Sequence, residues 1–131
     1  MPSTAEREAY QKAFDLLRGG RYDAAITGFR QFLKDYPKSG YAGNAQYWLG
    51  EAYYVSKDYP AAATEFQKVI SGYPDSSKVG DARLKLGFTY YELGDWQKSR
   101  DALTAVVKNH PGTTVARLAD QRLKRLQQEG H

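Results

Sequence analysis

The chain has 131 residues, 41% hydrophobic and 26% charged, which suits one soluble domain or one short solenoid. The net charge is only +4 and basic residues are mixed with acidic ones, so nucleic-acid binding is not expected. No apolar run approaches the length of about 18 residues that a membrane span needs. The absence of cysteine excludes disulfides, thiolate catalysis and cysteine-based zinc sites, and it fits an oxidising compartment.

Two amphipathic helices are predicted at the N-terminal end. Ser3 with Glu6 three residues later forms a capping box, so the first helix is expected over residues 4–18. The second is expected over residues 22–35. Arg21 holds its N-cap position and offers no side-chain oxygen, so this helix start should be the weaker one.

The same hairpin pattern returns twice at a fixed interval. Three sets of residues are spaced 37 positions apart: Tyr22, Tyr59 and Trp96; Phe29, Phe66 and Leu103; and Pro37, Pro74 and Pro111. Aromatic, apolar and proline positions kept in phase at this period indicate stacked helical hairpins.

Capping residues mark the ends of the predicted turns. Ser39, Ser76 and Thr113 share one phase and are expected to cap the first helix that follows each turn. Asp58 and Asp95 are expected to cap the second helices of the later hairpins.

A seventh helix is predicted over residues 114–129. Its apolar stripe is Val115, Leu118, Ala119, Leu123 and Leu126, and its other face is polar. A helix with one polar face is what the end of a repeat array requires.

Gly50 and Gly87 lie in the middle of predicted helices. Glycine there costs about 1 kcal/mol relative to alanine. Close approach of the two helices of a hairpin would offset that cost, so a packing role is predicted.

These residues resemble the tetratricopeptide (TPR) repeat family. The pattern that carries the resemblance is Gly50 or Gly87, Tyr53 or Tyr90, Ala62 or Ser99, Phe66 or Leu103, and Pro74 or Pro111. The family period is 34 residues, and the three extra residues fall in 38–41 and 75–78, where we expect an extension of each first helix. The predicted fold is an all-α solenoid forming a single domain over 1–131, with repeats at about 5–37, 41–74 and 78–111 and a capping helix at about 114–129.

No constellation for catalysis is evident. His110 and His131 are the only histidines and lie apart, the carboxylates are scattered, and no glycine-rich phosphate loop is present. We therefore expect a protein that is not an enzyme, without metal or cofactor.

An aromatic stripe on the first helix of each hairpin is the candidate binding surface. In the TPR family this stripe lines a concave groove that holds a partner segment. The predicted groove residues are Arg7, Tyr10, Phe14, Asn44, Tyr47, Glu51, Tyr54, Asp81, Leu84, Phe88, Tyr91 and Arg125. For any single aromatic, packing between neighbouring first helices is an equally good interpretation. The groove lacks the Lys, Arg and Asn clamp of chaperone-binding TPR domains, so a chaperone co-factor role is not expected.

Four sequence segments are similar to the C-terminal TPR domain of the Tol-Pal cell division coordinator family (YbgF). They are the segments around Tyr36-Pro37, residues 45–54, the segment around Tyr73-Pro74, and residues 110–116. This resemblance implies a periplasmic module that binds TolA and links peptidoglycan synthesis to outer-membrane constriction. It also implies an export signal and a trimerising coiled coil, neither of which is seen here, so we expect an excised, monomeric domain. The alternatives are a TPR lipoprotein scaffold of outer-membrane barrel assembly and a cytoplasmic TPR adaptor with a peptide in its groove.

Overall fold

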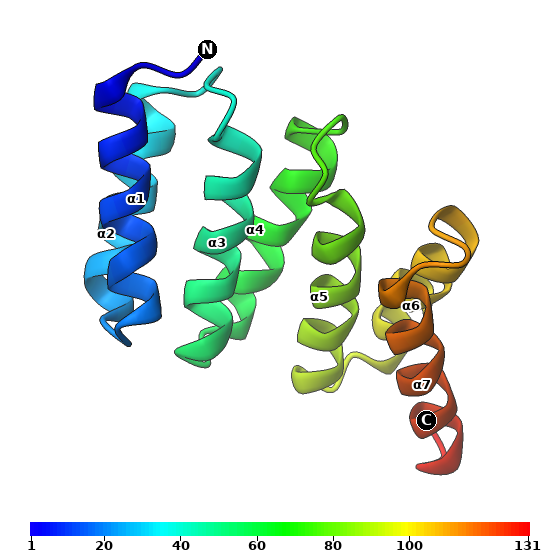
Figure 1. Ribbon diagram of the computed structural model, residues 1–131. Helices are drawn as coiled ribbons and strands as arrows, with labels where there is room; N and C mark the ends of the chain where they lie inside the picture. Colours follow the sequence, from blue (N-terminus) through cyan, green and yellow to red (C-terminus); the bar gives the residue numbers. More distant parts are fainter.

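Seven helices follow one another in a stacked array. The computed structural model describes all of residues 1–131 and contains no strand. The helices are α1 (Thr4–Arg18), α2 (Tyr22–Asp35), α3 (Ala42–Val55), α4 (Tyr59–Gly72), α5 (Val79–Glu92), α6 (Trp96–Asn109) and α7 (Thr114–Gln128). Helices α1, α3, α5 and α7 form one row and α2, α4 and α6 form a second row behind it (Figure 1). The all-α solenoid predicted from the 37-residue interval is confirmed.

Three apolar clusters hold the array together, and each joins a hairpin to the helix that follows it. Phe29 and Phe32 pack with Ala45 and Leu49 of α3. The later clusters combine Phe66 and Val69 with Ala82 and Leu86, and Leu103 and Val106 with Ala119 and Leu126. Because α7 completes the last cluster, it covers apolar surface that the third hairpin cannot bury alone, as a capping helix should.

The glycines at the centres of α3 and α5 allow the paired helices to touch. A Cβ atom built on Gly50 would lie 2.6 Å from Phe66 Cδ1, and one on Gly87 would lie 2.5 Å from Leu103 Cδ2. Real Cβ atoms do not approach other heavy atoms this closely, so a larger residue would push the helices apart. The predicted packing role of both glycines is confirmed.

Most helix starts follow the sequence prediction. Ser3 Oγ accepts from Glu6 N, Asp58 Oδ1 accepts from Ala61 N at 3.3 Å, and Asp95 caps α6 in the same way. The α2 start at Arg21 carries no side-chain cap. Thr113 caps α7, with its Oγ1 accepting from Ala116 N at 3.2 Å.

The prediction for the two longer turns is wrong. Helices α3 and α5 begin at Ala42 and Val79, after N-cap residues Tyr41 and Lys78 that make no side-chain cap. The Ser39 and Ser76 hydroxyls instead accept from the amides two residues on, each at 3.1 Å. That local hydrogen bond folds the segment into a turn, so the three extra residues lengthen the loop rather than the helix.

None of the helices combines the length and the apolar character needed to cross a lipid bilayer.

Replacing Gly87 by Ala should destabilise the protein by about 1–3 kcal/mol, because the added methyl group would overlap the Leu103 side chain. Intrinsic helix propensity alone would change stability by about 1 kcal/mol in the opposite direction. Urea unfolding followed by circular dichroism measures the difference. The matched control is Gly72→Ala in α4, where nothing lies within 4 Å of an added Cβ. Equal effects of the two substitutions would contradict the packing role of Gly87.

Removing residues 114–131 should expose Leu84, Leu103 and Val106, which α7 now covers. The shortened chain should aggregate or lose stability, because an uncovered apolar face favours association. Light scattering and thermal unfolding test this expectation. A shortened chain that stays monomeric and equally stable would show that α7 has no capping role.

Candidate functional site

The predicted groove residues all lie on the row formed by α1, α3, α5 and α7, which we call the odd-helix face (Figure 1). Arg7 and Arg125 are exposed. The half-buried members are Tyr10, Phe14, Asn44, Glu51, Tyr54, Asp81, Phe88 and Tyr91. A half-buried side chain on a packed helix is held in place and still offers part of its surface, so these residues suit a preformed contact surface.

Tyr47 and Leu84 belong to the core rather than to that surface. Tyr47 is only 6% exposed, and its ring centroid lies 5.6 Å from that of Phe66. Burial raises the pKa of Tyr47, and the nearby carboxylate of Glu51 adds to the effect, so the phenol stays neutral. Leu84 is 5% exposed and packs with Leu103. For these two positions the packing interpretation is right, because the neighbouring helix lies over them.

The N-terminal half of the odd-helix face is a chain of stacked aromatic rings. Tyr10 lies parallel to Tyr41 with 4.8 Å between ring centroids, and Phe14 meets Trp48 edge-on at 5.2 Å. The Arg18 guanidinium carbon lies 5.5 Å from the centre of the Phe14 ring. These rings bring α1 and α3 together and leave an aromatic surface with one cation at its edge.

Three further residues of this face escaped the sequence analysis. Trp48, Lys85 and Arg122 lie 37 positions apart, each directly after a member of the predicted stripe or its α7 counterpart. Trp48 and Lys85 are half-buried and contact neighbouring side chains: Lys78 Nζ lies 4.8 Å from the centre of the Trp48 ring. The repeat interval could have found them, since the stripe is two residues wide rather than one.

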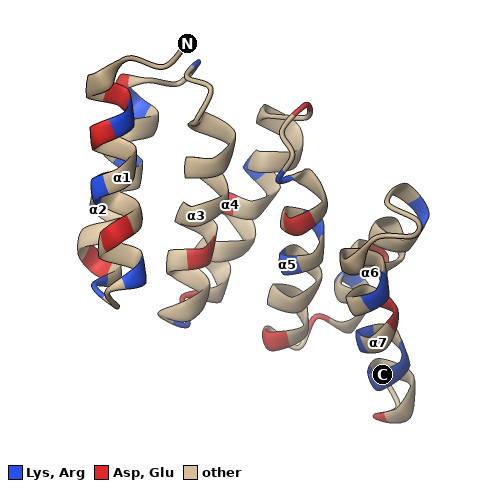
Figure 2. Ribbon diagram, viewed as in Figure 1, with Lys and Arg blue, Asp and Glu red and all other residues tan.

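Lys85 connects the middle of the face. Its Nζ lies 3.1 Å from Glu51 Oε1 and 4.9 Å from the centre of the Tyr54 ring. Glu51 is the only charged residue of α3, and Figure 2 shows a single red segment on that helix. The ion pair therefore neutralises the one charge that α3 would present to a partner. Burial also raises the pKa of Tyr54.

Arginines gather at the C-terminal end of the face, where the blue segments of α7 stand beside α5 (Figure 2). The Arg122 guanidinium carbon lies 4.1 Å from the centre of the Phe88 ring and 4.7 Å from that of Tyr91. Its Nη1 is buried and has no hydrogen-bond partner. Arg125 is instead paired with Glu129 at 3.3 Å. Arg122 is thus positioned by its contacts with two aromatic rings, and its Nη1 group remains free to donate a hydrogen bond.

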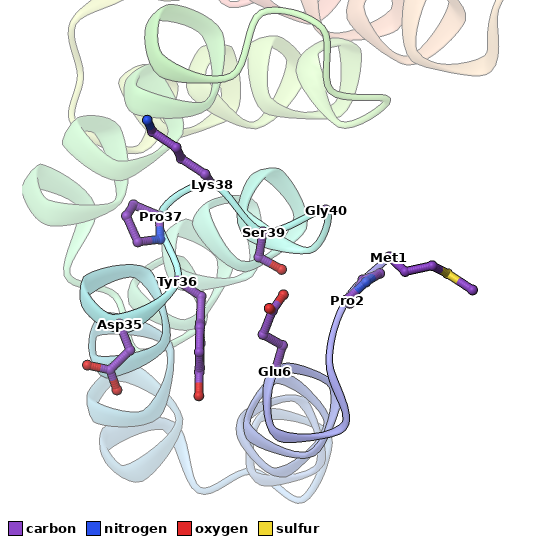
Figure 3. A pocket seen from close by; sticks show the side chains of 9 residues that line it. All are labelled: Met1, Pro2, Glu6, Asp35, Tyr36, Pro37, Lys38, Ser39 and Gly40. Atoms are coloured by element: carbon purple, nitrogen blue, oxygen red, sulfur yellow. The ribbon is translucent and has the colours of Figure 1, made fainter.

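No group of side chains arranged for catalysis lies on the odd-helix face. No group of three or more His, Cys, Asp or Glu side chains is placed to hold a metal ion. A cleft of about 430 Å³ lies between the N-terminal segment and the turn after α2 (Figure 3), and none of the predicted groove residues lines it. In it Glu6 points toward Ser39, and no catalytic pairing is formed. Aromatic rings with adjacent cations offer contact area and hydrogen-bond donors, which is the chemistry of a protein-binding surface.

Comparisons with known proteins agree with this description. The sequence profile of the YfiO family, described as outer membrane lipoproteins, matches residues 2–128. Relatives named cell division coordinator CpoB match part of the chain. The one from Pseudomonas putida is 54% identical over 46 residues, which are 35% of this chain and 17% of the relative. The one from Escherichia coli is 44% identical over 46 residues, 34% of this chain and 18% of the relative. The matched stretch therefore spans less than a fifth of either relative.

Solved structures establish the TPR fold. The Sgt2 TPR domain from Aspergillus fumigatus superposes with a TM-score of 0.80 at 18% identity, covering 98% of this chain and 83% of that one. The first TPR domain of Spaghetti (RPAP3), solved with the HSP90 peptide SRMEEVD, gives 0.79 at 16% identity, covering 98% and 95%. The resemblance to TPR repeats and to cell division coordinators found in the sequence is confirmed.

Replacing Tyr47 by Ala should cost about 3–5 kcal/mol of stability, as expected when a buried aromatic side chain is removed. Tyr54→Ala, at a half-buried position, should cost clearly less. Chemical denaturation of both variants measures the difference. Equal losses at the two positions would contradict the assignment of Tyr47 to the core.

Proposed function

The chain belongs to the YfiO family of outer membrane lipoproteins, and from that premise we propose that it is a non-enzymatic protein-interaction module of the cell envelope. The partner docks on the odd-helix face. The observation that carries the proposal is the row of half-buried aromatic side chains with adjacent cations, from Phe14 and Trp48 to Phe88, Tyr91 and Arg122.

The physical argument concerns the cost of binding. Aromatic and arginine side chains dominate binding energy at protein interfaces, and side chains that are already ordered lose little entropy on association. Phe88 and Tyr91 are held by Arg122, and Tyr54 is held by Lys85. A partner segment that covers these rings would bury apolar area without ordering them first.

TolA is the partner we propose, in the periplasm, with the module coordinating peptidoglycan synthesis and outer-membrane constriction during cell division. Support comes from the relatives named cell division coordinators, and their matched stretch is short. The isolated domain is proposed to be a monomer, and a longer protein containing it a trimer through a coiled coil. The peptidoglycan synthesis machinery is a further proposed partner.

A second candidate is a TPR scaffold of outer-membrane barrel assembly. The description of the matching family as outer membrane lipoproteins favours it. Both candidates place a protein segment on the odd-helix face and differ only in the identity of the partner.

Replacing Phe88 or Tyr54 by Ala should weaken binding to the C-terminal domain of TolA at least about tenfold, because each removes a desolvated aromatic contact worth about 2 kcal/mol. Isothermal titration calorimetry measures the affinity, and circular dichroism checks that each variant stays helical.

Lys34→Ala is the matched control, because Lys34 is an exposed residue of α2 outside the odd-helix face. It should leave the affinity unchanged. If both aromatic variants bind TolA like the parent while substitutions on α2, α4 or α6 abolish binding, the partner uses another face. If the parent does not bind TolA at all, components of the barrel assembly machinery become the next partners to titrate.

A further inference from the structure

A second surface lies between α4 and α6. Here α5 forms the floor of a cleft of about 380 Å³. Its apolar lining is Ile70, Leu86, Tyr90, Ala102 and Ala105. The charged residues at its rim are Arg83, Lys98 and Asp101. This cleft lies on another side of α5 from the predicted groove, since none of the groove residues lines it.

The equivalent place one repeat earlier, between α2 and α4, is filled by Glu65. This glutamate is only 3% exposed, although carboxylates are rarely buried. Gln46 Nε2 donates to its Oε1 at 3.0 Å and Lys68 Nζ donates at 3.3 Å. Arg30 lies 3.9 Å from its Oε2 and also donates to Tyr53 Oη at 2.9 Å. We call this place between α2 and α4 the first junction, and the place between α4 and α6 the second junction. In the first junction a hydrogen-bonded carboxylate is buried and leaves no open cleft at that position.

The 37-residue interval shows why the second junction stays open. Ala102 stands where Glu65 stands in the repeat before, and Ala105 stands in place of Lys68. Both substitutions shorten side chains on the α6 wall. The cleft thus lies where the first junction holds the buried Glu65 and, at its edge, the exposed Lys68.

Donors for a carboxylate remain in the second junction. Arg83 replaces Gln46 and makes no ion pair; its Nη1 lies 3.0 Å from His110 Nε2. Lys98 Nζ lies 5.5 Å from the centre of the Tyr90 ring and 3.9 Å from Asp95. The only rim carboxylate, Asp101, accepts from Gln97 at 2.9 Å. The cleft therefore combines apolar walls with an unneutralised guanidinium.

We propose that this cleft is a docking site for a glutamate side chain of a protein partner, presented between apolar residues. The glutamate takes the place that Glu65 fills in the first junction, with its stem against Leu86 and Ile70 and its carboxylate near Arg83. The occupant is defined by the chain's own neighbouring repeat, where the same backbone positions enclose a carboxylate.

Filling the cleft from within tests the site without a partner. Ala102→Glu should melt a few degrees higher than Ala102→Gln at pH 7. A carboxylate near Arg83 has its pKa lowered in the folded state. Its stabilisation is therefore present above the unfolded value of about 4.3 and is lost as the pH falls below it.

A Glu at 102 also lies four residues from Lys98, so the advantage of Glu over Gln is measured again in the Arg83→Gln background. It should shrink there if Arg83 receives the carboxylate. An advantage that persists unchanged reflects only a helical pair with Lys98 and overturns the proposal. So does a Glu variant that is no more stable than the Gln variant at pH 7.

Docking from outside is tested by nuclear magnetic resonance with the tripeptide acetyl-Leu-Glu-Leu-amide. The backbone amide signals of residues 67–70 and 98–105 should change their chemical shifts as peptide is added, and the changes should saturate. The expected dissociation constant is about 1–10 mM, as suits so small a ligand. The matched peptide with Gln should bind at least about fivefold more weakly, and the Ala102→Glu protein should not bind either peptide.

Phe88→Ala separates this site from the odd-helix face, and it should bind the Glu tripeptide like the parent. Equal binding of the Glu and Gln peptides, or shifts confined to the groove residues named above and absent from residues 67–70 and 98–105, would overturn the proposal. Neither result bears on the binding of TolA, so failure here and failure of the proposed function are distinguishable.

Discussion

The close approach of paired helices is the contact on which the rest of the solenoid depends. Gly50 lies against the Phe66 ring and Gly87 against the Leu103 side chain, with no room for a Cβ atom. The first hairpin reaches the same result differently. Its central residue is Ala13, and the small partner is Gly28, whose added Cβ would lie 3.0 Å from Ala13 Cβ. One close contact per hairpin brings the large side chains of α2, α4 and α6 under the following helix, where they form the core.

That packing decides which aromatic residues are available for binding. Helix α3 is covered on both sides and buries Tyr47, while Trp48 and Tyr54 stay half-buried beside it. Cations lie over the rings that remain accessible, Lys85 over Tyr54 and Arg122 over Phe88. A cation–aromatic contact orders both partners without removing the ring edge from solvent. These contacts hold the rings of the odd-helix face in place, and the rings keep part of their surface exposed.

The repeats are equivalent in backbone and different in the chemistry of their junctions. Gln46 and Lys68 close the first junction by donating hydrogen bonds to the buried Glu65. A buried carboxylate is tolerated only when its oxygens find donors, and here Gln46 and Lys68 supply them. Ala102 and Ala105 leave the second junction open. One array thus carries two kinds of surface, an aromatic row on the odd helices and an apolar cleft with a basic rim between α4 and α6.

The sequence by itself determined the number of repeats and their membership of the TPR family. It also determined the helix starts after Asp58 and Asp95 and the packing role of Gly50. All of these follow from short-range patterns that repeat in phase. It could not decide whether Ser39 would cap a helix or fold a turn, since both use the same hydroxyl within a few residues. Nor could it decide which aromatic of the stripe is buried. Tyr47 and Trp48 are neighbours on one helix, and only the placement of α4 and α5 over α3 put Tyr47 in the core. The tertiary structure made that choice, because burial depends on the neighbouring helix and not on local spacing.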